Sequence, residues 1–186
     1  MKIIEFTGTS KSGKSALIKK LDFYLKEKGM VSEIINEGFR SCSFKDRKDC
    51  VFDQQLWTVF TLGNRILKVV NSDIKLDYLF LDRGFWDRLV YIEFYRIKKV
   101  IRNHDYNFLL IILKRFLPSI DQVFFLILKP EISRERNLLR GKVSLFNIEE
   151  IAILNDLYSR YLPSNSVILD GENKLDDLFW DILGKI

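Results

Sequence analysis

The chain has 186 residues, 47% hydrophobic and 30% charged, which is typical of one soluble globular domain with a core of its own. A formal net charge of +5 fits either nucleic acid or arginines around a small anionic substrate, so the positions of the charges matter more than their sum. Two cysteines, Cys42 and Cys50, are too few for a disulfide framework and indicate a reducing, cytoplasmic setting.

The first half of the chain alternates between strand and helix patterns. A β-rich run at 2–6 precedes a glycine-bracketed loop, and from Lys14 apolar residues recur at spacings of three and four, which predicts a helix. Gly29 stands where a helix C-terminal glycine belongs. Further on we expect a strand at 31–35, a polar loop at 41–50, a helix through 56–70 and a strand at 78–82.

The second half continues the alternation. We expect helices around 89–95 and 105–117, a strand at 121–128, a helical basic segment at 130–142, a helix at 148–161, a strand at 166–170 and a last helix over 174–184. Near-continuous apolar strands that alternate with helices predict a parallel sheet covered on both faces. One α/β domain spanning 1–186 accounts for the sequence, and its apolar runs are too short to cross a bilayer.

The loop after the first strand reads "GTSKSGKS" and matches the phosphate-binding pattern G-x-x-x-x-G-K-[ST] in full, between a predicted strand and a predicted helix. Its glycines let backbone N–H groups turn onto phosphate oxygens at the start of the helix. Lys14 is expected to reach the β- and γ-phosphates, and Ser15 to hold Mg²⁺. The expected nucleotide-binding residues are Gly8, Ser10, Lys11, Ser12, Gly13, Lys14, Ser15 and Ala16.

This loop is shared by GTPases, motors, ATPases and kinases. A guanine-reading N-K-x-D occurs at 173–176, but no D-x-x-G follows the third predicted strand, and Asn173 serves better as the N-cap of the last helix. A motor or helicase needs a far longer chain. A small phosphotransferase or a small ATPase remains.

The arginines favour a phosphotransferase. Arg40 follows the second predicted strand, Arg83 follows Asp82 at the end of the third, and several arginines follow the fourth. Because ligands of a parallel sheet bind beyond the carboxyl ends of its strands, we expect these groups to meet the phosphate loop at one edge. Phosphoryl transfer depends on positioning and on neutralising charge, which such a cluster would provide.

In its order of motifs, "GTSKSGKS", "EGFR", "GNR", "LFLDRG" and "PEISRERNLLRG", the chain resembles the thymidylate kinase branch of P-loop kinases, with deoxynucleoside kinases as near relatives. The resemblance implies a three-layer P-loop NTPase fold with a five-stranded parallel sheet in the order 2-3-1-4-5. It also implies ATP as phosphoryl donor, Mg²⁺, and an arginine-rich lid at about 134–147. Arg136 and Arg140 would act in this lid, whose closure over the donor phosphates excludes water.

The resemblance also assigns roles on the acceptor side. Asp82 would act near Mg²⁺ and Arg83 on the phosphates that are bridged. Glu37 falls where nucleoside kinases place the base toward the acceptor hydroxyl, and Arg65 falls where thymidylate kinases contact the acceptor phosphate. Because relatives often dimerise through helices, the apolar face at 56–70 is a candidate dimer surface, although it could equally be core.

The acceptor itself stays open. The family's D-R-Y-x-x-S becomes "DRGFWD", with Gly84 and Asp87 in place of the aromatic and the hydroxyl. Five aromatic residues could stack a base, namely Phe39, Phe44, Trp57, Phe60 and Trp86. Among them Phe39 is the candidate, beside Arg40. We expect ATP-dependent transfer to a nucleoside or nucleoside monophosphate, and neither nucleic acid nor membrane as a partner. The rivals are a P-loop kinase of another small acceptor and a regulatory ATPase without an acceptor.

Overall fold

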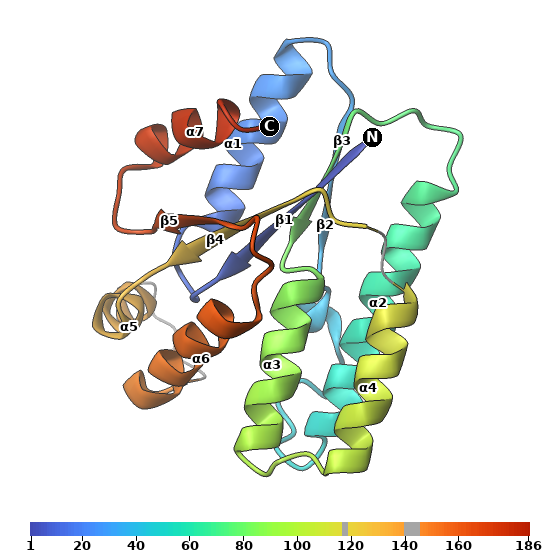
Figure 1. Ribbon diagram of the computed structural model, residues 1–186, viewed down its shortest axis with the longest axis vertical. Coiled ribbons are helices and arrows are strands. Elements are labelled where there is room, and N and C mark those ends of the chain that lie inside the picture. Colours follow the sequence, from blue (N-terminus) through green and yellow to red (C-terminus); the bar gives the residue numbers. More distant parts are fainter. Residues whose placement is uncertain (117–118, 140–145) are drawn as a thin grey trace.

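Figure 1 shows the computed structural model of the chain, which describes residues 1–116, 119–139 and 146–186. Five parallel strands form one sheet in the order β2-β3-β1-β4-β5, so the predicted topology is confirmed. The strands are β1 (Lys2–Gly8), β2 (Ser32–Asn36), β3 (Tyr78–Asp82), β4 (Gln122–Ile127) and β5 (Val167–Asp170). Because β1 is the central strand, the loop that follows it opens at the middle of the carboxyl edge.

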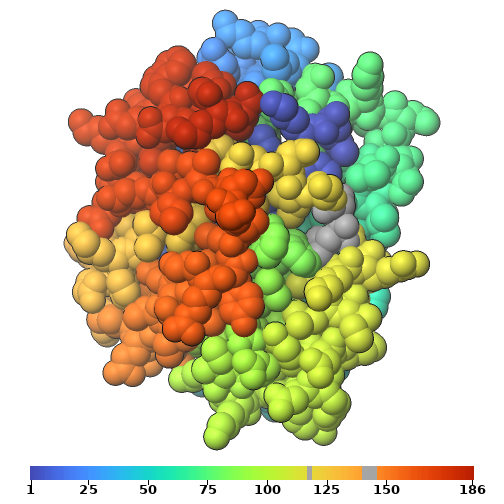
Figure 2. Space-filling view, in the orientation of Figure 1, coloured from blue at the N-terminus to red at the C-terminus, as the bar shows by residue number. Residues whose placement is uncertain are grey.

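Helices cover both faces of the sheet. On one face lie α1 (Lys14–Glu27) and α7 (Leu175–Leu183), and on the other α2 (Val51–Val70), α3 (Phe85–Ile97), α4 (Asn103–Phe116) and α6 (Ile148–Tyr161). The short helices η1 (Phe39–Ser41) and α5 (Pro130–Leu138) follow β2 and β4. The space-filling view in Figure 2 shows α7 in the upper part of the molecule and α3, α4 and α6 in the lower part. No helix in the described ranges is both long and apolar enough to cross a membrane.

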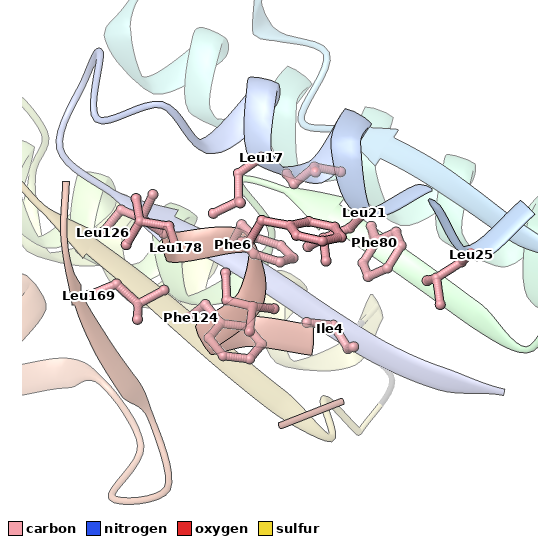
Figure 3. Close-up of a cluster of buried hydrophobic side chains, with 13 residues drawn as sticks. Ile4, Phe6, Leu17, Leu21, Leu25, Phe80, Phe124, Leu126, Leu169 and Leu178 are labelled. Atoms are coloured by element: carbon pink, nitrogen blue, oxygen red, sulfur yellow. The ribbon is translucent and has the colours of Figure 1, made fainter. Parts of the chain in front are cut away.

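Alternation along the central strand builds the first core. Ile4 and Phe6 of β1 point toward α1 and α7, and Figure 3 shows them packed against Leu17 and Leu21 of α1. The ring of Phe6 stacks on Phe124 of β4 with centroids 5.3 Å apart. Leu17 and Leu21 lie one helical turn apart, which is why the apolar spacing read from the sequence predicted this helix correctly.

The opposite face of the sheet packs mainly against α2, α3 and α6. On the α2 side, Leu79 and Leu81 of β3 meet Leu62 and Ile66 of α2. The candidate dimer surface at 56–70 is therefore core on one side, while its other side keeps three large apolar side chains exposed, namely Phe60, Leu67 and Val70. Whether the chain dimerises stays a prediction.

The helix ends confirm one predicted signal and correct another. Gly29 has the left-handed φ of 79° just after α1, where its N–H and that of Met30 bond back to the last turn of the helix. Asn173, in contrast, does not cap α7. The residue before that helix is Lys174, and the helix has no side-chain cap. The N–H of Asn173 instead bonds to the carbonyl of Asp170 in the turn after β5.

Candidate active site

The phosphate-binding sequence forms a tight loop between β1 and α1, as its pattern predicted. Gly8 has φ of 120° and lies so close to β4 that a Cβ there would stand 2.3 Å from the carbonyl oxygen of Leu126. Ser12 and Ala16 close the turns of the loop through backbone bonds to Thr9 and Gly13. At the start of α1, the N–H groups of Lys14 and Ser15 have no backbone acceptor within the described ranges, as expected of an anion-binding helix terminus.

Thr9 fastens the loop to its surroundings. Its hydroxyl donates to Asn155 Oδ1 of α6 (2.6 Å) and accepts from the N–H of Leu128 after β4 (3.2 Å). Asn155 completes the triangle by donating to the carbonyl of Leu128 (3.0 Å). The loop is thus tied to both a strand end and a helix that are distant in sequence.

Lys14 is folded into the loop. Its ammonium donates to the carbonyls of Gly8 (2.9 Å) and Thr9 (2.7 Å) and to the hydroxyl of Ser12 (3.2 Å). Burial, together with the Arg83 guanidinium, lowers the pKa of Lys14 to about 7. A polyphosphate seated in the loop would supply the negative charge that this buried ammonium lacks.

Ser15 and Asp82 meet as predicted. The Ser15 hydroxyl, in the first turn of α1, donates to Asp82 Oδ2 at the end of β3 over 2.5 Å. A hydroxyl and a carboxylate side by side, next to a phosphate-binding loop, form the hard oxygen donor set that Mg²⁺ prefers. The residues present therefore fit the ion, and Ser15 and Asp82 are the two that would hold it.

Helix α5 lies against the phosphate loop. Arg136 donates to the carbonyl of Gly171 (2.9 Å) and, more weakly, to that of Lys11 (3.4 Å), while the Ser133 hydroxyl donates to the carbonyl of Ser10 (2.9 Å). Arg136 and Asp82 thus both reach the loop that holds Ser15, as the sequence required. Arg140 lies in the part of the predicted lid, 140–145, that is outside the described residues, and the lid remains a prediction.

Asp87 is the centre of a buried ionic network that the sequence did not predict. Its carboxylate accepts from Arg83 (2.8 and 3.1 Å), Arg88 (2.8 Å), the hydroxyl of Thr7 (3.0 Å) and the hydroxyl of Tyr158 (2.5 Å). Burial alone would raise the pKa of Asp87, but the two guanidinium groups and Tyr158 hold it well below its usual range. Asp87 is therefore a fixed negative charge that orients Arg83 beside the phosphate loop.

Arg88 extends the network to Glu37. Arg88 Nη2 lies 2.7 Å from Glu37 Oε2, yet within the described ranges this buried oxygen receives no aligned hydrogen bond, and neither does Arg88 Nε find an acceptor. Arg88 Nη1 donates to Gln55 Oε1 over a long distance of 3.4 Å. Burial raises the pKa of Glu37, against the effect of Arg88 and Arg83. Glu37 is thus held by charge but keeps hydrogen-bonding capacity for a further group.

The other predicted acceptor-side residues follow β2. Arg65 of α2 donates to the carbonyl (2.9 Å) and side-chain oxygen (2.6 Å) of Asn36, next to Glu37. Phe39 and Arg40 lie on η1, where Phe39 is half-buried and Arg40 is exposed. The structure therefore brings Arg65 to the Glu37 segment and leaves Arg40 at the surface.

The remaining aromatic candidates line two surface hollows. Phe44, Trp57 and Phe60 belong to a hollow of about 480 Å³ between the 42–50 loop and α2, and Trp86 belongs to another of about 400 Å³ near the end of α4. Neither lining includes Phe39 or a residue of the phosphate loop.

Glu5 positions the helix that carries the network. This buried side chain of β1 accepts from the N–H groups of Gly84 (3.2 Å), Trp86 (3.2 Å) and Asp87 (3.0 Å) at the start of α3. Burial raises the pKa of Glu5 to about 8, although these three bonds oppose the shift. A Cβ at Gly84 would stand 2.8 Å from Glu5 Oε2, which explains the glycine in "DRGFWD".

Sequence reasoning missed Arg88, Gln55, Tyr158 and Glu5. Arg88 adjoins the departure from the family pattern at Asp87, and this was the one signal available. The other three reveal their role only once β1, α2 and α6 are placed around α3.

No protein-family model matches this chain, and no curated protein matches it in sequence. Solved structures do. A deoxyadenosine kinase from M. mycoides with bound dATP superposes with a TM-score of 0.79 at 18% identity, over 98% of both chains. The same kinase with the products dCMP and dCDP bound matches with a TM-score of 0.79 at 19% identity, over 98% of this chain and 97% of that one. From end to end, the chain therefore has the same fold as these structures.

Proposed function

We propose that this protein is an ATP-dependent kinase that transfers the γ-phosphoryl group to a hydroxyl of a nucleoside. The observation that carries the proposal is the Glu37 carboxylate. Arg88 Nη2 lies 2.7 Å from its Oε2 and joins it to the ionic network of Arg83, while 19% of the Glu37 side chain stays exposed. A carboxylate that is fixed by an ion pair but partly exposed can take the proton of a substrate hydroxyl. The likeness in fold to deoxyadenosine kinase structures supports the class of acceptor.

The chain's own groups define the reaction. The acceptor hydroxyl gives its proton to Glu37 while its oxygen forms the new bond to the γ-phosphorus. The bond from the γ-phosphorus to the β–γ bridging oxygen breaks, and ADP leaves with the electron pair. Lys14, Arg83 and Arg136 would neutralise the charge that is redistributed among the phosphate oxygens.

Magnesium fits the proposal through Ser15 and Asp82. These residues would hold the ion, which would supply further charge neutralisation. Asp82 accepts the Ser15 hydroxyl hydrogen bond in the free protein, so the two oxygens are already close.

A nucleoside is favoured over a nucleoside monophosphate by the charge at the acceptor position. Glu37 would repel an acceptor phosphate placed against it, and the arginine expected to bind that phosphate, Arg65, is engaged by Asn36. The monophosphate therefore enters the test as an outcome, as does an ATPase without an acceptor.

The test is a coupled assay of ADP release with ATP or GTP as donor and a panel of nucleosides, monophosphates and water as acceptors. We expect turnover with at least one nucleoside, and a loss of at least about 100-fold in kcat for Glu37→Gln, because a positioned base contributes this much or more. Lys14→Ala should abolish activity, whereas its matched control Lys19→Ala, on the exposed face of α1, should not.

Three results would contradict the proposal. Turnover with monophosphates alone would move the acceptor to the phosphate-bearing class. ADP release that no acceptor stimulates would indicate an ATPase. Full activity of Lys14→Ala would remove the phosphate loop from the mechanism altogether.

A further inference from the structure

We propose that Arg88 is a positioning residue, which sets both the place and the ionisation of the Glu37 carboxylate. Asp87 holds Arg88 from the other side. This inference rests on the proposed function for its kinetic consequence and on geometry for its basis. Asp87 departs from the family's D-R-Y-x-x-S pattern, which has a hydroxyl at that position, and Arg88 is the next residue in the sequence.

The geometry is that of one guanidinium between two carboxylates. Arg88 Nη2 lies 2.8 Å from Asp87 Oδ2 and 2.7 Å from Glu37 Oε2, and the Arg88 side chain is only 4% exposed. Asp87 is fully buried and is held in turn by Thr7 and Tyr158, which belong to other elements of the fold. A displacement of Arg88 would therefore leave two buried carboxylates without their shared cation.

An aromatic ring beside Arg88 further restricts the position of its guanidinium group. The guanidinium carbon lies 4.7 Å from the ring centroid of Tyr91, one turn along α3, in the geometry of a cation–π contact. Gln55 of α2 approaches from the other side. Contacts within α3 and with α2 thus fix the position of Arg88. Its ion pair with Glu37 can therefore fix the position of the segment that follows β2.

The charges around Glu37 decide which way its titration moves. Arg88 and Arg83 favour its ionised form, whereas burial, Asp87 and Asp82 favour the protonated form. Lys14 also faces it, because Glu37 acts on the titration of that lysine. Burial has the strongest effect on the Glu37 titration, and among the surrounding charges Arg88 is the strongest and the closest cation. Its removal should therefore make the Glu37 carboxylate harder to ionise.

The kinetic test compares Arg88→Met, Arg88→Lys and wild type across pH. A general base must be ionised, so kcat should rise with pH through the Glu37 titration. Arg88→Met should lower kcat by about tenfold or more, with KM for ATP nearly unchanged, and should move this rise to higher pH. Arg88→Lys should return the rise toward the wild-type position, because the cation is kept. Arg96→Met, which removes the arginine of a separate ion pair with Glu93 on the same helix, should leave the profile unchanged.

A second measurement does not depend on activity. The side-chain carboxyl of Glu37 is titrated by ¹³C NMR in the free protein, with Glu37→Gln to assign its resonance. Arg88→Met should raise the pKa of Glu37, and Arg88→Lys should raise it less. If Arg88→Met does not fold, the Arg88→Lys titration and the Arg96→Met control still decide the question.

The outcomes separate the two proposals. If wild type phosphorylates no acceptor but the Glu37 titration responds to Arg88, the proposed function fails and the coupling stands. If a nucleoside is phosphorylated and neither the pH profile nor the Glu37 titration changes in Arg88→Met, or if Arg88→Lys changes them as much as Arg88→Met, the positioning role is overturned.

Discussion

Binding of ATP should draw a proton from solution, and Lys14 is the group that takes it up. In the free protein, burial and Arg83 lower the pKa of Lys14 to about 7. Phosphate oxygens in the loop favour the ammonium form and should return its pKa toward the ordinary value. At pH 8 about 0.9 of the lysines are neutral before binding, so about 0.9 proton should be taken up per ATP, against about 0.1 at pH 6.

Calorimetry in two buffers of different ionisation enthalpy measures this uptake, because the difference in apparent binding enthalpy gives the number of protons. At pH 8 ATP is fully ionised and contributes none. Lys14→Met should bind ATP weakly and without proton uptake, and Lys19→Met should behave as wild type. An uptake near zero in wild type at pH 8 would refute the reasoning, because Lys14 would then hold the same charge with and without phosphates.

Three further predictions concern the fold. Gly8→Ala should lower the free energy of unfolding, measured by urea denaturation, by about 2 kcal/mol more than Gly13→Ala does. Both glycines have positive φ, but only a Cβ at position 8 would meet a carbonyl of β4. Equal losses in the two variants would contradict this. Leu178→Ala, in the core of α7, should cost about 2–5 kcal/mol by the same method, whereas Ile168→Ala, 62% exposed on β5, should cost far less. Asn147→Ala removes the capping box of α6 and should cost about 1 kcal/mol, and an unchanged thermal midpoint would speak against that cap.

Most of the fold could be predicted because its signals are local. The phosphate loop is one contiguous pattern, and each strand is an apolar run whose order in the sheet follows from the resemblance. Helix ends were less predictable. Asn173 is a preferred capping residue, yet the turn after β5 uses its N–H, and α7 begins one residue later, after Lys174. The turn after β5 therefore decides where α7 begins, in spite of the preference of asparagine for the N-cap position.

The candidate site divides in the same way. Ser15 and Asp82 could be expected to meet, because Ser15 follows β1, Asp82 ends the neighbouring β3, and the carboxyl ends of both strands share one edge. Arg88 could not, because a charged helical residue is ordinarily solvated, and only the fold supplies the two carboxylates that allow it to be buried. The roles of all these residues in catalysis stay predictions until the assays are made.

The triangle of Thr9, Leu128 and Asn155 has a mechanical consequence. It joins the start of the phosphate-binding loop to the residue that follows β4 and to helix α6, which is distant in sequence. A movement of α6 would therefore be transmitted to this loop, and contacts that hold α6 in place also hold the loop.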